Sequence, residues 1–148
     1  MTAEERGKFL FDLMYTISSL QLAVQITSLP DHRFAEVISV LASRPDLMAS
    51  IISWMTPLGR LRVASVISVS ALGEVYASLT ESDRKRMNCP ILFDWVKAAQ
   101  KTSDEKWKYG VGYVPGQNEW TAKTDSDRVG LALRMNDGQL DELQENLK

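Results

Sequence analysis

One uncharged run, Val63 to Gly73, constrains the fold of this chain more than any other feature of the sequence. It follows the pair Gly59 and Arg60, and it is too short to cross a membrane, which takes about 20 apolar residues. The surrounding stretch of about 20 residues without a turn signal is long for a strand. Its apolar residues cover a helix on nearly all sides. The sequence therefore predicts a central apolar helix over about residues 60–79, ringed by amphipathic helices.

Length and composition indicate a single domain over residues 1–148, with a turn-rich segment near 108–124. The chain has 148 residues, 45% of them hydrophobic, and a formal net charge of -2, which suits one substantial core. The mildly acidic balance gives no electrostatic reason to expect nucleic acid. Cys89 is the only cysteine, so an internal disulfide cannot form. The charged C-terminal stretch does not resemble a membrane anchor, and no transmembrane anchor is expected.

Local signals predict that the rest of the chain is also helical. Thr2 and Glu5 have the spacing of a capping box, so a helix should begin there. Apolar residues between Leu10 and Ile26 fall on two faces, which predicts one helix, or two broken near Ser18, enclosed on both sides. Further helices are expected to start after prolines and at capping residues: Pro30, Pro45, Pro57, Thr80 and Thr124. The predicted fold class is all-α.

Residues that could carry catalysis are scarce. His32 is the only histidine and Cys89 the only thiol, and apolar helices separate them. A nucleophilic Cys-His pair is the enzyme alternative, but a core thiol with a surface imidazole suits the pattern better. No metal-ligand spacing or phosphate-binding loop occurs, so we expect no enzyme, cofactor or metal. The remaining class of function is the binding of a partner through a surface of complementary shape. Four tryptophans would then be core or contact residues: Trp54, Trp95, Trp107 and Trp120.

Two sequence motifs resemble those of the Bcl-2 family of apoptosis regulators. The family's first homology motif, Asn-Trp-Gly-Arg, opens its central helix, and this chain has Pro57-Leu58-Gly59-Arg60. The second motif has a tryptophan in the last long helix, then another followed by glycines and an aromatic, like Trp95 and then Trp107 to Tyr113 here. The third motif, Leu-x-x-x-Gly-Asp, and the family's hydrophobic C-terminal anchor are absent. A short, divergent chain of this kind looks like the members carried by large DNA viruses.

The resemblance implies a Bcl-2-like helical bundle and an inhibitor of apoptosis. Such proteins hold the amphipathic BH-3 helix of a pro-apoptotic partner in a hydrophobic groove. The groove would lie between residues 31–44 and 46–55, floored by the start of the central helix. Gly59 and Arg60 are carried over from the motif, and Arg60 would pair with the partner's aspartate, although a helix-start arginine in water is the alternative for it. The remaining expected partner-binding residues are the pocket walls Leu47, Ile51, Val63 and Ile67 and the flanking Met48 and Met55.

The implied partners are pro-apoptotic BH-3 proteins of a host, met in the host cytoplasm and in association with mitochondria. A homodimer could cover an exposed groove of this kind. The alternative function is an all-helical structural or adaptor protein, such as a virion or assembly factor, that acts through self-association. Membrane insertion by the apolar run is a further reading, and Arg60, Arg62 and Glu74 make it costly.

Overall fold

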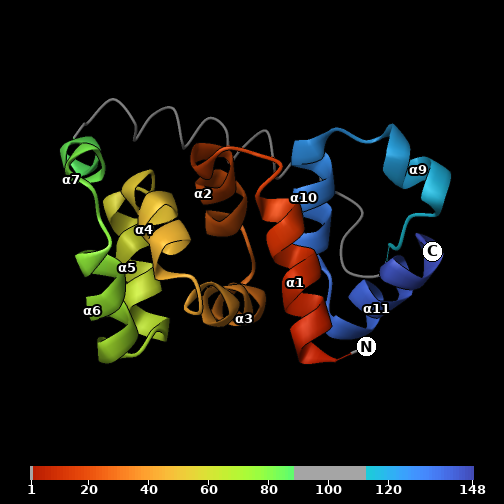
Figure 1. The fold of residues 1–148 in the computed structure, drawn as a ribbon, viewed down its shortest axis with the longest axis horizontal. Helices are drawn as coiled ribbons and strands as arrows, with labels where there is room; N and C mark the ends of the chain where they lie inside the picture. The colour runs from red at the N-terminus through yellow and green to blue at the C-terminus, as the bar shows by residue number, and fades with distance from the viewer. Residues whose placement is uncertain (1, 89–112) are drawn as a thin grey trace.

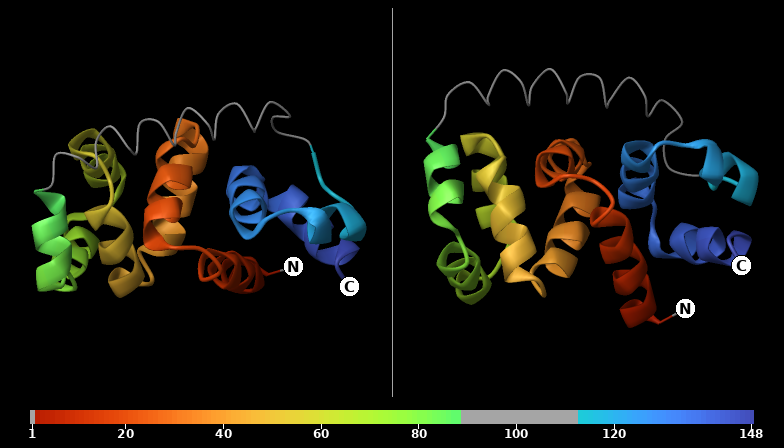
Figure 2. Two further views of the ribbon diagram at one scale, coloured as in Figure 1. Left: turned by 90° about the horizontal axis from the view of Figure 1, so that it is seen from above. Right: turned by 45° about the horizontal axis from the view of Figure 1, so that its top comes forward.

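The computed structural model describes residues 2–88 and 113–148, and ten helices lie within them (Figure 1). They are α1 (Ala3–Met14), α2 (Ser19–Thr27), α3 (Asp31–Leu41), α4 (Pro45–Ser53), α5 (Pro57–Val66), α6 (Val69–Ala77), α7 (Glu81–Met87), α9 (Gln117–Ala122), α10 (Asp125–Arg134) and α11 (Asp137–Asn146). No strand occurs in these described ranges, and the predicted all-α class is confirmed. The helices form an elongated array, with α6 and α7 at one end and α9 and α11 at the other (Figures 1 and 2).

The helix starts expected from capping residues are present. The Thr2 hydroxyl accepts a hydrogen bond from the Glu5 amide at 3.1 Å, which opens α1. Ser18 caps α2 in a reciprocal capping box with Gln21, so of the two predicted possibilities, one helix or two broken near Ser18, the structure has two helices. Thr80 caps α7 in a capping box with Asp83, and the Thr124 hydroxyl accepts a hydrogen bond from the Asp127 amide at the start of α10. Each cap satisfies an amide that the first turn of its helix leaves without a partner.

Helix α2 is enclosed by its neighbours and packs against α3, α4 and α10. Five consecutive residues, Leu22 to Ile26, are buried, so this helix faces neighbours on all sides. The next helix along the array, α4, buries Met48, Ala49, Ile51 and Ile52. The prediction that the segment up to Ile26 is enclosed on both sides is confirmed for α2.

The prediction of one helix over about residues 60–79 is wrong. Helix α5 ends at Val66, Ile67 and Ser68 have extended backbones, and α6 begins at Val69. The Ser68 hydroxyl accepts a hydrogen bond from the Ala71 amide at 3.2 Å. A serine side chain that bonds its own backbone in this way competes with helical hydrogen bonds, which is why serine caps helices better than it continues them. The uncharged run is therefore a corner between two short helices.

The prediction that this segment is buried at the centre is also wrong. Within α5 and α6 only Gly59, Val63 and Val75 are buried, whereas Leu61 is 67% exposed and Val69 is 88% exposed. The two helices lie at one end of the array, where α5 packs on α3 and α6 packs on α4 (Figure 2). An apolar sequence can be buried only where neighbours surround it, and here they cover one side.

Arg62 fixes α5 to the turn between α2 and α3. Its guanidinium donates to the Thr27 carbonyl at 2.9 Å, the Leu29 carbonyl at 2.8 Å and the Asp31 carboxylate at 2.8 Å. It also lies 3.9 Å from the centroid of the Phe34 ring. The Thr27 carbonyl is at the end of α2, where the last acceptors have no partner within the helix, and the Leu29 carbonyl lies in the turn that follows. One side chain therefore joins three helices.

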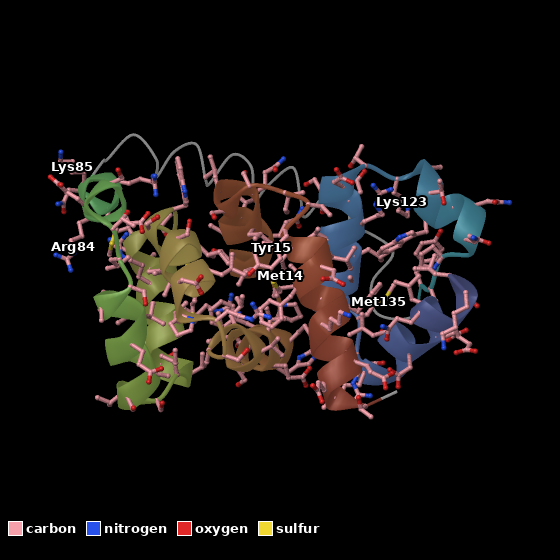
Figure 3. The ribbon with its side chains drawn as sticks, in the orientation of Figure 1. Met14, Tyr15, Arg84, Lys85, Lys123 and Met135 are labelled. Carbon is pink, nitrogen blue, oxygen red and sulfur yellow. The ribbon has the colours of Figure 1, made fainter. Side chains whose placement is uncertain are left out.

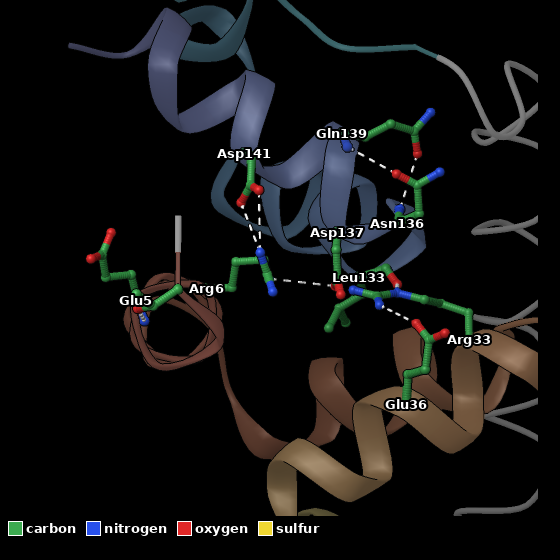
Figure 4. Close-up of polar contacts among 10 residues, drawn as sticks. Glu5, Arg6, Arg33, Glu36, Leu133, Asn136, Asp137, Gln139 and Asp141 are labelled. Atoms are coloured by element: carbon green, nitrogen blue, oxygen red, sulfur yellow. Dashed lines mark hydrogen bonds and ion pairs between the residues drawn. The ribbon is translucent and has the colours of Figure 1, made fainter.

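Arginines also tie the C-terminal helices to the first three. The Nε of Arg33 donates to the Leu133 carbonyl of α10 at 2.7 Å, and its Nη1 donates to Glu36 at 2.6 Å (Figure 4). Arg6 of α1 forms an ion pair with Asp141 of α11 at 3.2 Å (Figure 4). The Arg33 side chain is 5% exposed, so its bond to the Leu133 carbonyl is shielded from water and contributes more than a surface hydrogen bond.

Helix α7 is fixed to α4 by Asp83 and Arg86. Arg86 donates to the Asp83 carboxylate at 3.0 Å and to the Ser53 hydroxyl at 2.7 Å, and it lies 4.0 Å from the centroid of the Trp54 ring. Burial alone would raise the pKa of Asp83. The hydrogen bonds from Thr80 and Arg86 and the Arg86 charge outweigh it, and the pKa is lowered from its usual 3.8.

We expect Arg62→Ala to lower the free energy of unfolding by about 2–4 kcal/mol, because it removes charge-assisted hydrogen bonds and leaves two carbonyls without these donors. Arg62→Lys should be intermediate, since an ammonium lacks the planar fork. Arg84→Ala is the matched control, because the exposed Arg84 side chain forms no ion pair with the described residues. Urea unfolding measures all three, and equal midpoints for wild type and Arg62→Ala would contradict the role assigned to Arg62.

The lowered pKa of Asp83 predicts how stability depends on pH. A carboxyl with a lower pKa in the folded state stabilises the fold above about pH 4, and this contribution is lost as pH falls through the folded pKa. Asp83→Asn should therefore be less stable than wild type at pH 7, with the gap closing below about pH 4. Thermal unfolding of both proteins between pH 3 and 7 measures the gap. A gap that stays constant over this range would rule out the proposed contribution.

Candidate functional site

The side chains predicted to line a groove beside Arg60 lie mostly inside the core. Met48, Ile51 and Val63 are each 0% exposed and Met55 is 4% exposed. Two other expected wall residues, Leu47 and Ile67, are partly buried and pack against the same core. These residues hold α4 and α5 against the rest of the array. In this conformation the four most buried of them cannot be reached by a partner.

Gly59 and Arg60 also have roles within the chain. A Cβ on Gly59 would lie 3.3 Å from the Met55 Cβ and 3.6 Å from the Thr27 Cγ2, so glycine permits α5 to start close to α2 and to the end of α4. The Arg60 guanidinium donates to the Met55 carbonyl at 3.0 Å. The Gly-Arg pair thus closes the turn between α4 and α5, and the half-buried Arg60 sits beside core residues.

An open groove of about 810 Å³ lies between α1 and the end of α3. On the α1 side it is lined by Gly7, Phe11 and Tyr15, and on the α3 side by Val40 and Arg44. We call it the α1–α3 groove. It forms because α1 packs chiefly on α10 and α11, whereas α3 packs on α2, α4, α5 and α10.

The α1 wall of the groove follows from helical spacing. Gly7, Phe11 and Tyr15 are four residues apart, so they form one stripe along α1. Leu10 and Met14, on another side of the helix, are buried in the core. Tyr15 is 57% exposed at the end of α1 (Figure 3). The prediction that the apolar segment from Leu10 to Ile26 is enclosed on both sides is wrong for the end of α1, because Tyr15 is exposed beside the groove.

Charged side chains of both signs surround the apolar floor. The Arg44 guanidinium lies 5.0 Å from the centroid of the Phe11 ring, and it forms no ion pair with the described residues. Lys8 also lines the groove, and three acidic residues of α1 line the same space: Glu4, Glu5 and Asp12. An aromatic floor with free charges at its edges suits an amphipathic segment of another protein.

Other candidate residues add no reacting constellation. His32 is exposed on α3, whereas Cys89, Trp95, Trp107 and residues 108–112 of the turn-rich segment lie outside the described residues. Within residues 2–88 and 113–148, no group of three or more potential metal ligands comes together. Trp120 is buried in α9 and stacks on Phe9 with ring centroids 6.4 Å apart. α9 itself shows that residues 117–122 of the segment expected to be rich in turns are helical.

Comparisons with protein-family models, curated proteins and solved structures found no match to this chain. No helix in the described part of the chain has the length and apolar character needed to span a bilayer. Function must therefore be inferred from the surfaces that the described helices leave open, and the α1–α3 groove is one of them.

Proposed function

We propose that this chain is a recognition protein that holds an amphipathic helix of another protein in the α1–α3 groove. The observation that carries the proposal is the groove itself, about 810 Å³ with Phe11 and Tyr15 on its floor and Arg44 at its edge. Concave sites that combine apolar side chains with a few polar groups are where proteins commonly bind ligands. Helix-in-groove binding uses an apolar stripe on one partner and a matching trough on the other.

The length of the groove wall suits a helix of three turns. Helix α1 has 12 residues, which is about 18 Å at 1.5 Å per residue. Four apolar anchors at positions i, i+4, i+7 and i+11 of a bound helix span about 16 Å by the same rise. A bound helix could therefore align along α1 and place its apolar anchors over Tyr15 and the part of Phe11 that remains exposed, 7%.

Charge would set the direction and specificity of binding. Arg44 is exposed and carries no ion pair within the described residues, so it is available to a carboxylate. A guanidinium grips a carboxylate through two parallel hydrogen bonds. The bound helix should present an aspartate or glutamate to Arg44 and basic residues to the acidic rim of α1.

The BH-3 helix of a pro-apoptotic host protein is the specific ligand that the resemblance implies. It has the required four apolar anchors and one aspartate. In this proposal Arg44 takes the role that the sequence motif assigned to Arg60, because Arg60 is engaged with the Met55 carbonyl. Sequestration of that helix in the host cytoplasm or at mitochondria would inhibit apoptosis.

The second candidate function is a structural or adaptor protein that acts through self-association. The specific observation in its favour is the exposure of large apolar side chains on α6, where Val69 is 88% exposed and Tyr76 is 43% exposed. This surface belongs to a different helix from those that form the α1–α3 groove. The two functions can therefore be tested separately.

We expect a BH-3 peptide to bind with one-to-one stoichiometry and Arg44→Glu to weaken binding at least tenfold, about 1.4 kcal/mol. The variant places a negative charge beside the peptide's aspartate. Val69→Glu is the matched control, because it introduces the same charge at an exposed position on α6 and should leave the affinity unchanged. Isothermal titration calorimetry measures each affinity.

Three results would contradict the proposal. Absence of saturable binding to a panel of BH-3 peptides would rule out the proposed ligand. Equal affinities for wild type and Arg44→Glu would place the binding site elsewhere. Loss of binding in Arg60→Glu, with Arg44→Glu unaffected and both variants folded by circular dichroism, would return the site to the position that the sequence motif predicts.

A further inference from the structure

We propose that two copies of this chain form a twofold dimer through α6. Three residues form a stripe along this helix at positions i, i+4 and i+7: Val69, Gly73 and Tyr76. Val69 is the most exposed large hydrophobic residue in the described part of the chain, at 88%, and Tyr76 is 43% exposed. We call these three residues the α6 stripe.

Gly73 gives the α6 stripe a hollow between two projecting side chains. A Cβ built on Gly73 meets no atom within 4 Å, so packing within the chain does not require glycine here. Glycine inside a helix costs about 1 kcal/mol relative to alanine. The open space around Gly73 leaves room for a second helix to approach closely.

The stripe is complementary to itself. If two α6 helices cross antiparallel with the twofold axis at Gly73, then Tyr76 of each copy lies beside the partner's Val69, because they are three and four residues from the axis. The helix dipoles then oppose each other favourably. Glu74, the only charged residue of α6, points away from the stripe by helical geometry. The projecting groups on each copy thus flank the hollow on the other.

The two ends of the array favour a closed pair over a chain of copies. Helix α6 lies at one end and α11 at the other (Figure 1). The α9 and α11 end exposes polar and charged residues: Glu119, Asp137, Glu142, Glu145 and Lys148. Head-to-tail addition would bury Val69 against these charges, which is costly. Contact between identical α6 surfaces avoids that cost and closes after two copies.

The neighbouring charges are compatible with this contact. Arg84 and Lys85 of α7 lie at the same end of the molecule (Figure 3), and both are exposed. They are long side chains that can remain in water beside an apolar contact. The net charge of -2 gives two copies little overall repulsion.

Sedimentation velocity of the full chain over 1 to 500 μM tests the proposal. We expect a monomer–dimer equilibrium with a limiting mass twice the chain's 16.6 kDa. Val69→Glu should raise the dissociation constant at least tenfold. Gly73→Gln should also weaken the dimer by filling the hollow, while its melting temperature at low concentration stays equal or rises, because glutamine favours helix more than glycine. If Gly73 were needed only for the fold of the monomer, Gly73→Gln would instead lower the melting temperature.

Tyr15→Glu is the control variant, because it places the same charge on another exposed aromatic residue, in the α1–α3 groove. It should leave the dimer unchanged. A wild-type protein that stays monomeric to 500 μM, a mass that grows beyond two copies, or dissociation by Tyr15→Glu but not by Val69→Glu would each overturn the proposal. None of these readouts uses a peptide, so failure of the dimer and failure of the proposed function are distinguishable.

Discussion

The middle of the molecule depends on Arg62, whose guanidinium joins the end of α2, the start of α3 and helix α5. The helices that it joins have between 9 and 11 residues, and isolated helices of that length are marginal in water. Their stability must come from packing and from partners for the carbonyls at their ends. Arg62 supplies donors to one such carbonyl, that of Thr27, and to the Leu29 carbonyl in the following turn, and its guanidinium lies over the Phe34 ring. Without it, α5 would lose its polar attachment to the α2–α3 turn.

Arginine side chains also donate hydrogen bonds between helices that are far apart in the sequence. Arg33 donates to a carbonyl of α10, and Arg134 of α10 donates to the Ser28 hydroxyl at 2.9 Å. These bonds hold α10 against α2 and α3, so a C-terminal helix helps to enclose the centre. An array built in this way leaves surfaces uncovered where the packing stops. The α1–α3 groove and the α6 stripe are two such surfaces, and they carry the proposed binding functions.

Much of the secondary structure could be predicted because its signals are local. Thr2, Ser18, Thr80 and Thr124 cap helices as expected, since a cap depends on a few neighbouring residues. Burial could not be predicted in the same way. The run from Val63 to Gly73 is apolar, yet Ser68 breaks it and few helices surround it, which depends on contacts with distant residues. The groove in the structure differs from the groove predicted beside Arg60 for the same reason. Met48 and Ile51 have the composition of pocket walls, but α2 and α6 cover α4, whereas Phe11 and Tyr15 stand beside a gap that only the packing of α1 and α3 reveals.

Amide hydrogen exchange followed by NMR tests most directly whether α2, rather than the uncharged run, is the centre of this fold. The structure predicts that the amides of Leu22 to Ile26 exchange slowest. It also predicts that Ser68, Val69 and Ser70 exchange within minutes at neutral pH, because a helix start leaves these amides without helical acceptors. Uniformly slow exchange from residue 60 to residue 79 would show one continuous buried helix and would contradict the account.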